Sequence, residues 1–225
     1  MEGAPLLLTD LPADVVQHIV VRLTLAHHIA RAAPTCTVVS VAARNLIKAR
    51  GFSSEVVTLA GHTSTVYGVA AAPDGRIVTG SADRTIKVWR EGTCERTIQA
   101  QTSWVSAVAA MPDGQRILSG GMDDTVRVWL LDGTLENTFS ELHDAWVRAL
   151  VALPDNQHAL SASNDHTVKL FNVNDGTVLR TFKHHVQPDQ SRAAVCLALL
   201  PDGLRFVSGS CDGTAVIAEH GLAPQ

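Results

Sequence analysis

Between residues 54 and 218 the apolar positions fall in short runs that polar turns separate. Val66 to Ala70, Ile77 to Thr79 and Thr85 to Trp89 are such runs, because they are rich in β-branched residues and either alternate or stay apolar. Pro-Asp-Gly at Pro73 and similar turns punctuate them. Short β-branched runs bounded by Pro, Gly and Asp predict a stack of short antiparallel strands.

Two short motifs recur along this region. Pro-Asp occurs at Pro73, Pro112, Pro154 and Pro201. Asp-x-Thr occurs at Asp83, Asp123, Asp165 and Asp212, with spacings of 40, 42 and 47 residues. A period of about 40 to 45 residues with four strands per unit is typical of a β-propeller blade. We therefore predict a mainly β domain over residues 51–225, with repeats at about 54–92, 93–133, 134–176 and 177–219.

The second motif reads Ser-Ala-Asp-Arg-Thr-Ile-Lys-Val-Trp in the first repeat and Gly-Met-Asp-Asp-Thr-Val-Arg-Val-Trp in the second. With three strong copies and an eroded fourth, about 165 residues resemble the WD-repeat family. The resemblance implies that each blade holds a hydrogen-bonded set of four side chains. These are a His in the loop that enters the blade, a hydroxyl on the second strand, the turn Asp and a Trp on the third strand. In the first repeat they are His62, Thr79, Asp83 and Trp89.

The later repeats keep this set in part. The hydroxyl and the Asp recur as Ser119 with Asp123, Ser161 with Asp165, and Ser208 with Asp212. The Trp recurs as Trp129, whereas Phe171 and Ala218 replace it in repeats three and four. At the His position stand Gln101, His143, and either His184 or His185. We expect a weakened blade wherever one member is lost, because an unpaired buried polar group costs about 1 to 3 kcal/mol.

The phase of the repeats bears on how the domain closes. Val56 to Leu59 is predicted as an outermost strand, and the fourth repeat reaches its third strand near residue 218. Pairing of the two would complete the last blade and leave no open edge. Four blades are the lower limit of the usual range of about four to eight. A small closed ring, the pairing of two chains into a homo-oligomer and a truncated gene product remain alternatives.

Residues 1–50 have a helical pattern. Val15, Val16, Ile19, Val20 and Leu23 share one side of a predicted helix, with Asp10 as its cap and Pro12 in its first turn. A second apolar group follows around Ile29, and a third helix is predicted from Thr35 through Leu46. The pattern predicts a short three-helix segment in front of the repeats.

A Leu-Pro that opens such a segment immediately before repeats resembles an F-box, which docks substrate receptors onto the adaptor subunit of SCF-type ubiquitin ligases. The matching positions are Leu11, Pro12, Val16, Ile19, Leu23 and Cys36. The usual Trp after the Cys is absent, and Thr24 to His28 departs from the usual charged turn. The resemblance implies an adaptor-binding surface formed by Leu11, Pro12, Val15, Val16, Ile19 and Leu23. The alternative is a helical cap that packs on the propeller, because amphipathicity says only that one face is buried.

Charge and composition narrow the function. Residues 1–50 carry a net charge of +2 and the remainder −6, so no basic stripe is present to bind nucleic acid. The apolar runs are too short to span a membrane, and the acidic start does not resemble a signal peptide. Four scattered cysteines without a Cys-x-x-Cys pair fit reduced thiols in a cytoplasmic or nuclear protein.

Catalytic and metal chemistry are not expected. Ser, His and Asp recur with every blade, whereas a catalytic triad occurs once. His27-His28 and His184-His185 lack a third ligand at a useful spacing, and no Gly-rich phosphate loop is present. We predict neither a cofactor nor a metal, and a protein that is not an enzyme.

Protein binding has a predicted place. The resemblance implies that one face of the ring is lined by residues that flank the start of each first strand and by the residue before each turn Asp. The principal members are Tyr67, Trp104, Met122, Trp146, Arg148 and Asn164. Large aromatic residues and Arg are enriched in binding hot spots. The alternative is that both Trp residues only cover blade edges. We interpret the chain as the substrate-recognition subunit of an SCF-type ligase, or alternatively as a general WD-repeat scaffold.

Overall fold

The computed structural model describes residues 56–183, 185 and 193–222, and all structural statements below concern them. From Val57 onward they belong to one compact unit, Val57–Gln225. The helices predicted within residues 1–50 lie outside this described part, as does His184. Among the described residues no helix is long and apolar enough to cross a membrane.

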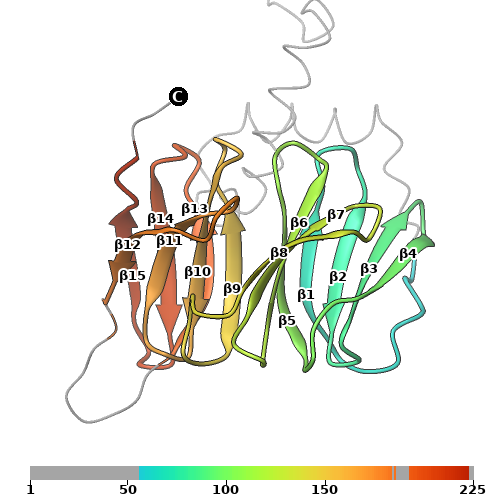
Figure 1. Ribbon diagram of the computed structural model, residues 1–225, viewed down its shortest axis with the longest axis horizontal. Coiled ribbons are helices and arrows are strands. Elements are labelled where there is room, and N and C mark those ends of the chain that lie inside the picture. The colour runs from blue at the N-terminus through green and yellow to red at the C-terminus, as the bar shows by residue number, and fades with distance from the viewer. Residues whose placement is uncertain (1–55, 184, 186–192, 223–225) are drawn as a thin grey trace, which may run out of the picture. The chain divides into compact units, whose positions relative to one another are not determined.

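The fold is mainly β, with four antiparallel sheets that follow one another in chain order (Figure 1). We call them blades 1 to 4. Blade 1 contains β1 (Val66–Ala71), β2 (Ile77–Ser81), β3 (Thr85–Arg90) and β4 (Thr93–Gln99). Blade 2 contains β5 (Val105–Ala110), β6 (Arg116–Gly121), β7 (Val126–Leu130) and β8 (Leu135–Phe139). Blade 3 contains β9 (Val147–Ala152), β10 (His158–Ser163), β11 (Val168–Asn172) and β12 (Val178–Phe182). Blade 4 contains β13 (Ala194–Leu199), β14 (Arg205–Ser210) and β15 (Ala215–Glu219).

The two recurring motifs are the turns that fold each blade. Pro-Asp lies between the first strand and the second, and in blade 1 the following Gly75 adopts a φ of 86°, a conformation that glycine adopts without steric cost. Asp-x-Thr joins the second strand to the third, and the residue between Asp and Thr is left-handed in every blade. Its φ is 71° at Arg84, 63° at Asp124, 71° at His166 and 80° at Gly213. This turn therefore has one geometry in all four blades.

Apolar side chains fill the space between successive blades. Val78, Ile86 and Val88 of blade 1 pack with Val105 and Val108 of blade 2. A second cluster joins blades 2 and 3, and a third joins blades 3 and 4. The first strands β1, β5, β9 and β13 consequently lie side by side in that order. Each interior blade thus buries both of its faces.

One expectation about the outer strands was wrong. Val56 to Leu59 forms no strand, and Val56 and Val57 are exposed. Blade 1 already has four strands, because β4 is its outermost strand, so it offers this segment no place in its sheet. The three-stranded sheet in the described part is blade 4. The segment lies at the opposite end of the row of blades from that blade, so the pairing that would close a four-blade ring, one of the alternatives above, is not formed in the described part of the chain.

Candidate functional site

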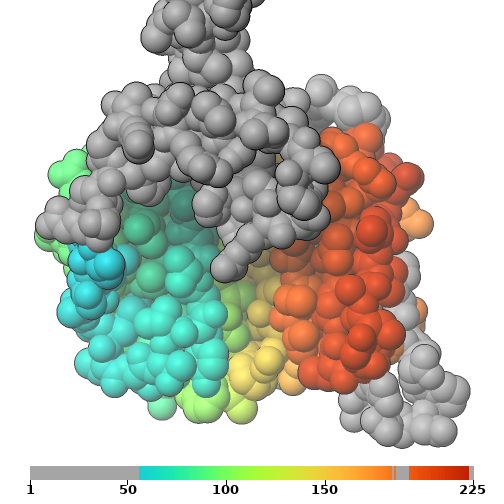
Figure 2. Space-filling view, turned by 180° about the vertical axis from the view of Figure 1, so that it is seen from behind, coloured from blue at the N-terminus to red at the C-terminus, as the bar shows by residue number. Residues whose placement is uncertain are grey.

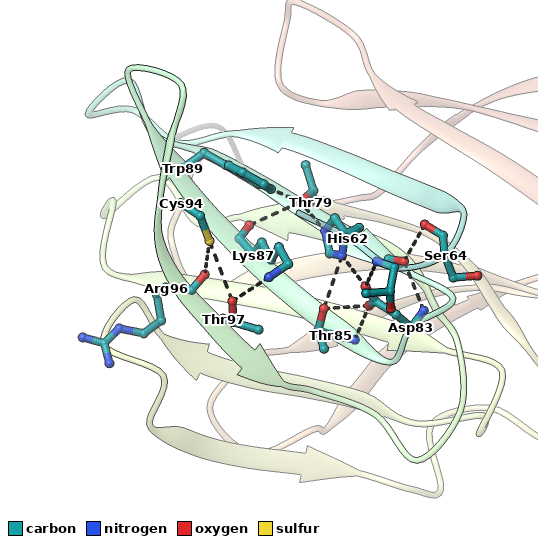
Figure 3. Close-up of polar contacts among 12 residues, drawn as sticks. His62, Ser64, Thr79, Asp83, Thr85, Lys87, Trp89, Cys94, Arg96 and Thr97 are labelled. Atoms are coloured by element: carbon teal, nitrogen blue, oxygen red, sulfur yellow. Dashed lines mark hydrogen bonds and ion pairs between the residues drawn. The ribbon is translucent and has the colours of Figure 1, made fainter. Parts of the chain in front are cut away.

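The predicted set of blade 1 is assembled from four separate elements (Figure 3). His62 precedes β1, Thr79 lies on β2, Asp83 lies in the following turn and Trp89 lies on β3. His62 Nδ1 is 2.8 Å from Asp83 Oδ2, and His62 Nε2 is 2.7 Å from Thr79 Oγ1. The Trp89 indole N–H donates to Thr79 Oγ1 over 2.8 Å. A neutral His62 with its hydrogen on Nδ1 pairs all of these atoms, since Nε2 then accepts the Thr79 hydroxyl.

The carboxylates of these sets are held ionised. Burial by itself raises the pKa of Asp83, but hydrogen bonds from Thr85, the Thr63 main chain and His62 outweigh it and leave the pKa well below its usual range. Asp165 behaves alike: burial is outweighed by hydrogen bonds from His143 and Thr167. Donors that favour the charged form lower a carboxyl pKa. The ionised Asp is therefore the form that the blades stabilise.

Blade 2 has Gln101 in place of the His, and its contacts are rearranged. Gln101 Nε2 donates to Ser119 Oγ over 3.3 Å, and the Trp129 indole donates to the same oxygen over 2.9 Å. Gln101 does not take over the contact with the turn Asp. Asp123 instead accepts from the main-chain N–H and the hydroxyl of Thr102, both over 2.8 Å. The blade keeps a hydrogen-bonded interior with different partners.

Blade 3 keeps the His and loses the Trp. His143 Nδ1 lies 2.6 Å from Asp165 Oδ2, and Nε2 lies 2.7 Å from Ser161 Oγ. Phe171 is fully buried and packs edge-to-face on Phe139, with ring centroids 6.0 Å apart. It occupies the position of the Trp but has no N–H to give to Ser161.

Blade 4 uses the second of its two candidate histidines. His185 is buried, and its Nε2 lies 2.9 Å from Ser208 Oγ. The distance from its Nδ1 to Asp212 Oδ2 is 3.4 Å, longer than the 2.8 and 2.6 Å of blades 1 and 3. With Ala218 at the Trp position, this is the loosest of the four sets.

These sets are structural in their placement. Ser119, Ser161 and Ser208 are fully buried and Thr79 nearly so. A hydroxyl enclosed between strands cannot reach a substrate, so the Ser, His and Asp trio does not form a triad with access to solvent. No group of His, Cys, Asp and Glu in the described residues is arranged to hold a metal ion.

The predicted binding face is built at one end of the first strands. In every blade the residue before the turn Asp donates its main-chain N–H to the residue before the first strand. These bonds join Ala82 to Thr65, Met122 to Trp104, Asn164 to Trp146 and Cys211 to Ala193, over 2.8 to 3.1 Å. Four equivalent pairs thus lie at the same end of four adjacent blades. Ser106, the second residue of β5, is buried, and its hydroxyl donates to the main-chain carbonyls of Gly120 and Val147.

Three rings from three blades meet on this face. Tyr67 stacks on Trp104, with ring centroids 5.6 Å apart and an interplanar angle of 20°. Trp146 meets both edge-on, at 6.5 Å from Tyr67 and 6.1 Å from Trp104. Tyr67 and Trp104 remain 45% and 39% exposed, and Met122 is 46% exposed. We call Tyr67, Trp104, Met122, Trp146 and Arg148 the aromatic face.

One polar group of the aromatic face packs on a ring, and another makes no hydrogen bond. The Arg148 guanidinium lies over the Trp146 ring, 4.3 Å from its centroid. The indole Nε1 of Trp146 is buried without a hydrogen-bond partner. A buried N–H without a partner is costly, and one at a surface that binds a ligand can be satisfied by an incoming acceptor.

Several contacts were not foreseen from the sequence. The stacking of Tyr67 on Trp104 joins residues far apart in the chain that occupy different positions in their repeats, since Tyr67 is the second residue of β1 and Trp104 precedes β5. Arg127 was also missed, although its guanidinium lies 3.1 Å from Asp123 Oδ2. Asp124 was not singled out; burial first, then the charges of neighbouring aspartates, raise its pKa. The spacing of charged residues in the sequence predicts neither the ion pair of Arg127 nor the raised pKa of Asp124.

The chain belongs to the WD-repeat family: the model described as "WD domain, G-beta repeat" matches residues 53–90, 92–129, 133–172 and 176–217. This family is generally non-catalytic, and its propellers are typical protein-interaction scaffolds. Among solved structures the chain is similar to the WD40 β-propeller domain of Doa1, with 32% sequence identity and a TM-score of 0.66. The match covers 75% of this chain and 54% of that one, so the chain spans about half the length of this neighbour. No curated protein matches the sequence.

Proposed function

We propose that the chain is a protein-recognition module and that the aromatic face is its contact surface. The observation that carries the proposal is the cluster of Tyr67, Trp104 and Trp146, which three successive blades bring together at one end. Two of these rings stay exposed beside Met122. Large rigid aromatic side chains supply much contact area at little cost in conformational entropy.

The chemistry of the face favours a protein partner over a nucleic acid. Residues 51–225 carry a net charge of −6, and Arg148 is engaged with the Trp146 ring. Phosphate recognition needs several charge-assisted donors. An apolar or aromatic peptide side chain that packs on the exposed rings of Trp104 and Tyr67 fits the groups present.

A phage-displayed library of random peptides, selected against the immobilised chain, tests this proposal. Selected peptides should lose binding to Trp104→Ala, measured by fluorescence polarisation. They should keep binding to Leu135→Ala, since Leu135 is similarly exposed but lies on β8, the outermost strand of blade 2. Equal binding to both variants would show that the face is not the contact surface.

We further propose that residues 1–50 dock the module onto the adaptor subunit of an SCF-type ubiquitin ligase, so that the aromatic face presents a target protein. The resemblance of Leu11, Pro12, Val16, Ile19 and Leu23 to an F-box supports this role, and these residues lie outside the described part of the chain. The chain would then act in the cytoplasm or nucleus. The alternative is a WD-repeat scaffold of another complex, with this segment as a cap.

A pull-down of the SCF adaptor subunit separates the two roles. The native chain should capture the adaptor, and Leu11→Asp combined with Ile19→Asp should lose it while circular dichroism stays unchanged. Capture by neither protein would leave the scaffold role. The peptide-binding experiment on the aromatic face is independent of this outcome.

A further inference from the structure

Blade 1 exposes apolar side chains at positions where blades 2 and 3 bury theirs. The first and fourth positions of the first strand are Val105 and Val108 in blade 2 and Val147 and Leu150 in blade 3. All four contact the preceding blade and are at most 7% exposed. The same positions in blade 1 are Val66 and Val69, which are 43% and 67% exposed. Blade 1 is therefore shaped to follow another blade.

Blade 4 carries the complementary side. The relevant position is on the third strand, three residues after the turn Thr. In blades 1 to 3 it is occupied by Val88, Val128 and Leu170. These side chains pack toward the following blade and are at most 1% exposed. The equivalent residue of blade 4 is Ile217, which is 62% exposed. Figure 2 shows the two flanks: blade 1 in cyan and blade 4 in red stand on opposite sides, with green and yellow atoms of the intermediate residues visible between them.

A small residue receives the first valine at two of the junctions between blades. Val105 Cγ1 lies 2.6 Å from the place that a β-carbon on Gly80 would occupy, and Val147 Cγ1 lies equally close to that place on Gly120. Gly209 stands at the same position of blade 4, three residues before the turn Asp. The Sγ of Cys196 now lies over it, and a rotation about χ1 would move this atom aside. With Cys196 rotated, this place on blade 4 would accept a valine such as Val66.

Each end of the row of blades also has a backbone segment that lacks a strand partner. Among the described strands, β15 is the edge of a three-stranded blade and pairs with β14 alone. Val56 to Leu59 ends three residues before His62, just as β12 ends three residues before His185, yet it pairs with no strand. A free β-branched segment and an open strand edge can join by strand addition.

We propose that two copies of this chain associate head to tail, with blade 1 of each on blade 4 of the other, to complete a ring of eight blades. Both halves of one junction are present on this chain, so a second copy supplies what each end lacks. The four blades of this chain superpose on about half of the propeller domain of Doa1. Their curvature therefore fits a ring about twice as long as this chain. A two-fold axis makes both junctions identical and closes the assembly within the usual range of about four to eight blades.

Sedimentation velocity on the full chain tests the proposal. The native chain should sediment as a dimer at micromolar concentration. Val69→Asp and Ile217→Asp should each weaken the dimer at least about tenfold, because each charge is buried at both junctions. Both side chains are exposed in the single chain, so the variants should fold and keep the native circular dichroism spectrum. Leu135→Asp, an equally drastic change on an exposed outer strand, should leave the dimer intact.

A mixture of the two variants tests the head-to-tail arrangement. In a dimer of one Val69→Asp chain and one Ile217→Asp chain, one junction carries both changes and the other is native. A second Asp adds little to a junction that the first has already opened, so the equimolar mixture, which keeps one native junction, should dimerise more strongly than either variant alone, which keeps none. A monomeric native chain, a dimer that neither variant weakens, or a mixture no stronger than its components would each overturn the proposal.

Discussion

The indole N–H of Trp89 donates to Thr79 Oγ1 over 2.8 Å and so ties β3 to β2 inside blade 1. The same hydroxyl lies 2.7 Å from His62 Nε2, so one oxygen serves two buried nitrogens. Blade 3 has the equivalent hydroxyl on Ser161, but Phe171 gives it no indole. The two blades therefore provide a matched comparison of how much one hydroxyl contributes.

Thr79→Val should destabilise the protein more than Ser161→Ala. The first change leaves Trp89 Nε1 and His62 Nε2 unpaired, at about 1 to 3 kcal/mol for each buried group, whereas the second leaves only His143 Nε2. The expected difference is about 1 to 2 kcal/mol in the free energy of unfolding, measured by urea titration. Adding Trp89→Phe to Thr79→Val should cost less than Trp89→Phe alone, because the indole has already lost its acceptor. Equal losses for the two single variants would contradict the shared role of Thr79.

Acid should destabilise the blades through Asp83 and Asp165. Their pKa values are lowered in the folded protein, so the unfolded chain binds protons more readily as pH falls. The stability contributed by ionisation is complete above the unfolded pKa of about 3.9 and is lost as pH falls through the lower folded pKa. Urea midpoints should be lower at about pH 3 than at pH 7 on this account.

Asp165→Asn is the control for this pH dependence. The variant should be less stable than the native chain at pH 7, because the amide replaces a carboxylate that accepts from His143 and Thr167. The gap should narrow in acid, where the native carboxyl also becomes neutral. A gap that stays constant down to the lowest pH would show that ionisation of Asp165 contributes nothing.

The sequence predicted the repeats and most of the blade interior, because both depend on residue types that recur at fixed positions. It placed Thr79, Asp83 and Trp89 in one set, and the structure brings them together. The strand at Val56 to Leu59 was wrong, since a strand needs a partner edge and no local pattern shows whether that edge is within reach. The convergence of Tyr67, Trp104 and Trp146 depends on how three blades pack, which periodicity within one blade does not contain.

His166→Gly should stabilise the protein. His166 has a φ of 71°, its Nδ1 is buried without a partner, and blade 4 already has Gly213 at the same turn position. A left-handed conformation costs a non-glycine residue about 1 to 2 kcal/mol, and glycine removes this cost. Glycine also loses more chain entropy on folding, which offsets about 0.5 to 1 kcal/mol of the gain. The net gain should be about 0.5 to 1 kcal/mol, visible as a higher Tm. His166→Val should lower the Tm, since β-branched residues avoid this conformation; a higher Tm for the valine variant would refute the explanation.

Trp146→Phe and Trp129→Phe make the same chemical change at two sites with different hydrogen bonding. The Trp129 indole donates to Ser119 Oγ, whereas Trp146 Nε1 is buried without a partner. Loss of the Trp129 bond should cost about 1 to 2 kcal/mol. Loss of the Trp146 N–H removes a group that stabilises nothing in the free protein, so Trp146→Phe should be nearly neutral in urea unfolding. A phenyl ring at 146 also keeps an apolar surface for Arg148 and Trp104. If Trp146→Phe nevertheless weakens peptides selected on the aromatic face, its N–H acts in binding; if it costs as much stability as Trp129→Phe, the indole has a partner in the folded chain.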